Sequence, residues 1–117
     1  MEFYNKTRTY MIRKEKYGED NMEIGYQEDI DDLAILLYKD YDYDSSIEVD
    51  PGFIVDVDKN NKLVAIEVVG CAEQLGTSKE YVKSAKKEVF VELNEYSYKI
   101  IISFNDGERE IVKRVLK

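Results

Sequence analysis

The sequence predicts an α+β fold that is predominantly β. An antiparallel meander with a tight hairpin comes first, one short helix follows, and a second antiparallel three-stranded meander ends the chain. Three observations predict it. Apolar and polar residues alternate over residues 53–58 and 96–104, which is the period of a half-buried strand. A single helix-capping pattern stands at residues 77–80. The length, 117 residues, suits one domain.

The beginning of the chain has a different character from the rest. Residues 1–21 are largely polar and predict an N-terminal extension, and residues 22–117 predict a single compact domain. Residues 23–27 alternate as a strand, and an acidic turn follows at residues 28–32. The continuous apolar run at residues 33–38 predicts a strand that is covered on both faces.

The hairpin at residues 53–69 is the clearest local structure. Pro51 and Gly52 mark a turn or a bulge before it. Phe53, Val55 and Val57 share one face, and Ile54, Asp56 and Asp58 share the other. Asn60 and Asn61 suit the two central positions of a tight turn, since Asn tolerates positive φ.

The last third of the chain predicts one helix and one small sheet. Residues 77–87 form the helix, with a hydroxyl cap at Thr77 and Glu80 three residues later. Residues 88–117 form the closing meander, in which the Asp106–Gly107 pair predicts a hairpin turn. The compact domain therefore divides into an acidic β region (22–76), a helix (77–87) and a β meander (88–117).

Composition excludes several classes of chemistry. The chain has no His and a single Cys, Cys71. Without an imidazole there is no Ser-His-Asp or Cys-His pair and no structural zinc site of the Cys/His kind. One Cys cannot form an internal disulfide, so Cys71 is expected to be a packed, inert thiol. We predict a protein that is not an enzyme and has no cofactor.

Charge is concentrated in the middle of the chain. Residues 21–76 carry 14 acidic and 3 basic side chains, within a net charge of −8 for the whole chain. Such a block repels a phosphate backbone, so it disfavours direct nucleic-acid binding and favours a basic protein partner or a cation. No apolar run is long enough for a signal peptide or a membrane span, so we expect no membrane contact and a cytoplasmic location.

The densest group of acidic residues interleaves with tyrosines, and Tyr is enriched in binding hot spots. We predict this group as the partner-binding surface. A solvated loop, a divalent-cation site and paired-carboxylate catalysis are the alternatives. Its members are Asp29, Asp31, Asp32, Asp40, Tyr41, Asp42, Tyr43 and Asp44.

A second group resembles a calcium loop in its spacing. Asp56, Asp58, Asn60 and Glu67 occupy positions 1, 3, 5 and 12 of a twelve-residue segment. A calcium loop lies between helices, however, and both flanks here alternate as strands. A plain polar hairpin turn is therefore the competing interpretation of a weak calcium or magnesium site.

Several short pieces in a fixed order carry a family resemblance. A tyrosine precedes an acidic turn, an apolar strand follows, and then come a valine–aspartate strand and a strand with a central Glu. In this sequence the pieces are Tyr26 with residues 27–32, Leu33 to Leu37, Ile47 to Val49 with Gly52, Ile54 to Asp58, and Leu63 to Val69.

From Ile24 to Val69 the chain thus resembles the domain of unknown function 2283. The resemblance implies a small, β-rich, cytoplasmic protein with no assigned activity and no catalytic motif. It also implies an association with antitoxins, since some members look like partners of compact basic ribonucleases.

These observations lead to one principal hypothesis. The chain is predicted to be a non-catalytic acidic interaction module that binds a small basic partner, such as an antitoxin-type inhibitor would. The alternatives are a divalent-cation-binding domain and a nucleic-acid mimic that blocks a nucleic-acid-processing enzyme. A homodimer is expected as well, because the exposed edges of a small sheet must be capped or paired.

Overall fold

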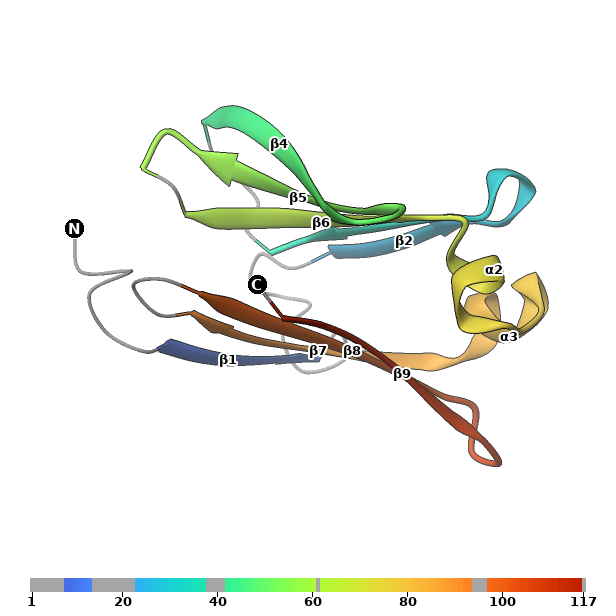
Figure 1. Cartoon of the computed structure of the whole chain (residues 1–117). Coiled ribbons are helices and arrows are strands. Elements are labelled where there is room, and N and C mark those ends of the chain that lie inside the picture. Colours follow the sequence, from blue (N-terminus) through green and yellow to red (C-terminus); the bar gives the residue numbers. More distant parts are fainter. Residues whose placement is uncertain (1–7, 14–22, 38–41, 61, 94–96, 117) are drawn as a thin grey trace.

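The computed structural model describes residues 8–13, 23–37, 42–60, 62–93 and 97–116. Two antiparallel sheets stack face to face, and two short helices lie at one end of the stack (Figure 1). The elements in chain order are β1 (Arg8–Arg13), β2 (Glu23–Gln27), the 3-10 turn η1 (Glu28–Ile30), β3 (Asp32–Leu36), β4 (Tyr43–Asp50), β5 (Phe53–Asp58), β6 (Leu63–Val69), α2 (Cys71–Leu75), α3 (Lys79–Ser84), β7 (Lys86–Leu93), β8 (Tyr98–Asn105) and β9 (Glu110–Leu116). The predicted class, α+β with β predominant, is confirmed.

The order of the strands follows the order of the chain in one sheet but not in the other. The four-stranded sheet has the order β1-β7-β8-β9, in which β7, β8 and β9 form the predicted three-stranded meander and β1, from the predicted extension, adds an edge. The five-stranded sheet has the order β2-β3-β6-β5-β4. Here β4, β5 and β6 form a meander, but β3 pairs with β6, so the chain crosses to the far edge between β3 and β4.

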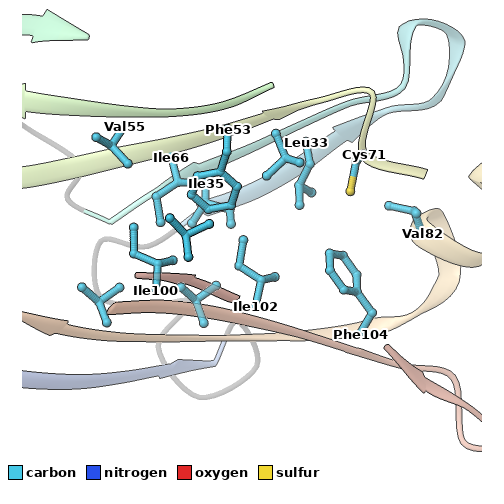
Figure 2. Packing of buried hydrophobic residues seen from close by; sticks show 14 of the residues in the cluster. Leu33, Ile35, Phe53, Val55, Ile66, Cys71, Val82, Ile100, Ile102 and Phe104 are labelled. Carbon is cyan, nitrogen blue, oxygen red and sulfur yellow. The ribbon is translucent and has the colours of Figure 1, made fainter. Parts of the chain in front are cut away.

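Both sheets contribute to one hydrophobic core (Figure 2). Phe53 and Ile66 point from the five-stranded sheet toward Ile100 and Ile102 of the other sheet, and each of the four is at most 2% exposed. Val82 from α3 closes the end of this core. The alternation predicted for residues 53–57 is confirmed, because Phe53, Val55 and Val57 are buried and the residues between them are partly exposed.

Three local expectations need correction. The predicted run at residues 33–38 is covered on one face only over its described part, residues 33–37, since Ala34 in β3 is exposed, and Tyr38 lies outside the described residues. The helix predicted over 77–87 is shorter: α3 ends at Ser84, and Lys86 and Lys87 begin β7. Its cap is Ser78, whose Oγ accepts a hydrogen bond from Tyr81 N–H (3.1 Å).

The turn predicted at Asn60 and Asn61 also needs correction. The backbone N–H of Asp58 donates to the carbonyl of Lys62 (3.0 Å), so three residues separate the closing pair of the β5–β6 hairpin. A two-residue turn centred on Asn60 and Asn61 would close at Lys59 instead, and Asn61 lies outside the described residues. The Asp58 carboxylate organises this turn by accepting from the N–H groups of Asn60 and Lys62.

Gly52 joins β4 to β5 in a conformation that needs glycine. Its φ is +72°, and its N–H donates to the Glu48 carboxylate (2.9 Å). A Cβ at this position would lie 2.6 Å from Gln74 Nε2 and 2.8 Å from the carbonyl oxygen of Val69. We expect Gly52→Ala to lower the free energy of unfolding by about 2–3 kcal/mol, because it adds backbone strain and a steric clash.

A matched control separates these two costs. Gly107 also has positive φ (+97°), but a Cβ there would meet no atom within 4 Å. Gly107→Ala should therefore lower the free energy of unfolding by only about 1 kcal/mol in urea denaturation, from backbone strain alone. Equal losses in the two variants would show that the contact with Gln74 and Val69 does not constrain Gly52.

Candidate functional site

The outer face of the five-stranded sheet is acidic. Its five strands contain eight acidic residues and no Lys or Arg. The strands of the other sheet contain seven basic and three acidic residues. The two layers of the sandwich therefore carry charge of opposite sign.

Strand register places most of these carboxylates on the side away from the core. Residues directly opposite each other in neighbouring strands share a face. Ala34 of β3 lies opposite Glu67 of β6, which lies opposite Ile54 of β5, which in turn lies opposite Glu48 of β4. We call this surface the acidic face. Its carboxylates are Glu23, Asp32, Glu48, Asp56 and Glu67.

A chain of hydrogen bonds crosses the acidic face near β4. The Tyr43 hydroxyl and the Ser46 hydroxyl lie 2.8 Å apart, and Ser46 Oγ donates to the Asp56 carboxylate (2.7 Å). Tyr43 is 54% exposed, so its ring is available to a partner while its hydroxyl is held. Sequence reasoning missed Ser46, since a serine in a loop-like stretch gives no signal.

Asp32 and Glu67 form a close carboxylate pair on the same face. Hydrogen bonding with Asp32 raises the pKa of Glu67, and burial together with the charges of Asp32 and Asp56 raises it further. Oδ1 of Asp32 is buried without a donor in the described part of the protein. A proton on Glu67 would supply that donor, which is how the hydrogen bond with Asp32 raises the pKa of Glu67.

The residues of the predicted calcium-like group take part in separate interactions. Asp58 is engaged with the hairpin turn, Asp56 with Ser46, and Glu67 with Asp32. Asp56 lies opposite Ala65 and not opposite Glu67. Within the described ranges, no three His, Cys, Asp or Glu side chains are arranged to hold a metal ion.

The predicted partner-binding residues do not share one environment. Asp29 is exposed in η1, and Asp42, Tyr43 and Asp44 are exposed at or just before β4. Asp32 lies on the acidic face. Asp40 and Tyr41 lie outside the described residues, and Asp31 has a structural environment unlike that of any other member.

Asp31 joins the β2–β3 turn to helix α2. Its Oδ1 accepts hydrogen bonds from the Tyr26 hydroxyl (2.5 Å) and from the N–H of Ala72 (2.8 Å), and Oδ2 accepts from the N–H of Glu73 (3.3 Å). Its backbone carbonyl accepts from Gly70 and Cys71. Asp31 is 9% exposed with φ of 55°, so this carboxylate caps α2 across 41 residues of sequence and is not available to a partner.

These contacts perturb the titration of their members. Burial alone would raise the pKa of Asp31, but the hydrogen bonds from Tyr26, Ala72 and Glu73 outweigh it and hold the pKa below its ordinary value. Burial and the bond to Asp31 raise the pKa of the Tyr26 hydroxyl. Burial, with the nearby Asp31 charge, raises the pKa of the Cys71 thiol to about 12, so Cys71 is a poor nucleophile near neutral pH.

Comparison with known proteins gives one match. The model of the family described as Protein of unknown function (DUF2283) matches residues 23–70, which confirms the resemblance inferred from residues 24–69. The matched segment contains the whole five-stranded sheet, from β2 through β6. Searches of curated proteins and of solved structures found no match. Neither described helix has the length and apolar character that crossing a membrane requires.

Proposed function

We propose that the chain is a non-catalytic interaction module that binds a basic protein through the acidic face. The observation that carries this proposal is the one-sided charge of the sandwich: eight acidic residues and no Lys or Arg in the five strands of one sheet. A basic partner that approached this face would meet a field of one sign, which steers association and disfavours acidic competitors.

The surface also has features of a protein-binding site beyond charge. Tyr43 lies on edge strand β4 on the acidic side, and Ile47 lies at the rim of the same strand on its other face, opposite Val55; both side chains are about half exposed. Exposed aromatic and aliphatic side chains among charges supply the apolar contact that a charged rim alone lacks. An antitoxin-type inhibitor of a small basic protein is the specific form of this function that we propose.

Co-expression with the product of the neighbouring gene tests the proposal. Light scattering should show a hetero-complex, and its dissociation constant should rise with salt. The double variant Glu23→Lys/Asp44→Lys should weaken the complex by about 10–100-fold, since it reverses two exposed charges of the five-stranded sheet, Glu23 of the acidic face and Asp44 next to Tyr43.

The matched control makes the same change in net charge elsewhere. Glu80→Lys/Glu108→Lys reverses two exposed acidic residues on α3 and in the β8–β9 turn. This control should bind within about threefold of the unmodified chain. Equal weakening by both double variants, or the absence of any complex with the neighbouring product, would argue against the acidic face as the binding surface.

A further inference from the structure

The outer edge of β9 is a well-formed and regular strand edge. β9 is the last strand of its sheet and pairs with β8 over seven consecutive residues with no register shift. No other described strand pairs with its outer edge, so that edge presents a row of backbone donors and acceptors. Such an edge is a template for a further strand.

The side chains of β9 are complementary to a second copy of the same strand. Glu110, Val112 and Arg114 alternate on the outer face of the sheet. In an antiparallel pair centred on Val112, Glu110 of each copy lies opposite Arg114 of the other, and the two Val112 side chains meet at the two-fold axis. Opposite charges directly across a strand pair stabilise it, and like charges destabilise it.

This register is distinguished from its neighbours. A slip of one residue would place residues of opposite faces across from each other, so only a slip of two residues keeps the outer faces of the two copies matched. A shift of the centre to Ile111 or Lys113 places either Glu110 or Arg114 opposite Val112, so both charge pairs are lost.

The other sheet edges are less suited to self-pairing. The charged residues of β4 are all acidic and its register with β5 shifts twice, and those of β1 are both Arg. β2 has five residues with Gly25 at its centre. Among the described strands, β9 is therefore the edge whose charges favour a second copy over repulsion from it.

The outer face of the four-stranded sheet is hollowed next to β9. A depression of about 450 Å³ lies on the outer face of the four-stranded sheet, and Phe90 and Ile101 supply its apolar floor. Glu110, Val112 and Arg114 of β9 form its border. Leu116, 65% exposed at the end of β9, would lie beside the β8–β9 turn of a second copy.

We propose that the chain forms a two-fold dimer by antiparallel pairing of β9 with β9 of a second copy, centred on Val112. The pairing makes one continuous eight-stranded sheet from two four-stranded sheets. It uses the opposite layer from the acidic face, so it is independent of the proposed function.

A charge-swap series tests the dimer and its register. Sedimentation or light scattering of the unmodified chain at micromolar concentration should give twice the 13.7 kDa chain mass. Glu110→Arg alone and Arg114→Glu alone should each weaken the dimer about tenfold or more, because each creates two like-charge contacts. The double variant Glu110→Arg/Arg114→Glu restores complementarity and should restore the dimer, which no folding defect would do.

A crosslink locates the two-fold axis. Val112→Cys should form a disulfide between copies on oxidation, whereas Ser103→Cys, one strand inward in the same row, should not. A monomer at all concentrations would overturn the proposal. So would a dimer that survives both single charge reversals, or one that dissociates in Glu23→Lys/Asp44→Lys, since either would place the interface elsewhere.

Discussion

Replacing Asp31 with Ala should lower the free energy of unfolding by about 3–5 kcal/mol. The change removes the acceptor of three hydrogen bonds and leaves the N–H of Ala72, a buried residue, without its partner. It also removes the cap of α2 and places Ala at a φ of 55°. Urea denaturation followed by circular dichroism measures the loss.

The conservative variant separates geometry from charge. Asn keeps one acceptor oxygen and tolerates positive φ, so Asp31→Asn should cost about 1–2 kcal/mol at neutral pH. The folded state lowers the pKa of Asp31, so its contribution is complete above the unfolded value of about 3.9 and is lost as pH falls through the folded value. Asp31→Asn should therefore lose stability less steeply with acid than the unmodified chain. Parallel acid profiles would contradict this assignment.

Replacing Phe53 with Ala should lower the free energy of unfolding by a similar amount, about 3–5 kcal/mol. Phe53 is fully buried at the contact between the two sheets (Figure 2), and its ring is also 6.0 Å from the Lys113 ammonium. Truncation leaves a cavity that neither sheet can fill without moving. Thermal or urea unfolding of the variant and of the unmodified chain gives the difference.

A control substitution and the shape of the unfolding transition are needed to interpret the stability loss of Phe53→Ala. Ile30→Ala removes an apolar side chain that is 59% exposed and should change stability by no more than about 0.5 kcal/mol. Because both sheets share one core, Phe53→Ala should shift one cooperative transition. Separate transitions, with the four-stranded sheet unaffected, would show that the sheets fold independently.

Local pattern in the sequence predicts much of this fold. The period-two alternation at residues 53–57 and at Tyr98, Ile100, Ile102 and Phe104 identifies strands and their buried faces, because every second residue meets the same core. The Asp106–Gly107 turn forms as predicted, with Asp106 Oδ1 accepting from the N–H groups of Glu108 and Arg109. These features depend on residues close in sequence.

Features that depend on distant residues were not predictable in the same way. The pairing of β3 with β6 joins segments about 30 residues apart, and the alternation of each strand fits several partners. The cap of α3 is Ser78 and not Thr77, whose Oγ1 accepts a hydrogen bond from the distant Arg109. Neither the pairing of β3 with β6 nor the hydrogen bond of Thr77 can be inferred from residues that are adjacent in sequence.

The acidic face, too, was predictable where it depends on composition and not where it depends on contacts between distant residues. Its overall charge follows from composition, and Tyr43 and Asp32 were placed in it from sequence. Asp31 is indistinguishable from its neighbours by residue type, yet it is buried because the N-terminus of α2 lies against it. Glu67 was assigned to a cation loop by spacing, whereas strand register places it beside Asp32.

The buried thiol of Cys71 gives experimental access to motions at the helical end of the sandwich. It is the chain's single cysteine, it is fully buried, and its pKa of about 12 suppresses reaction in the closed state. The thiolate is the nucleophile that reacts with thiol-modifying reagents, so modification requires α2 to separate from the Asp31 turn. The ratio of the labelling rate of the native chain to that of the unfolded chain then measures how often this end opens, without any substitution.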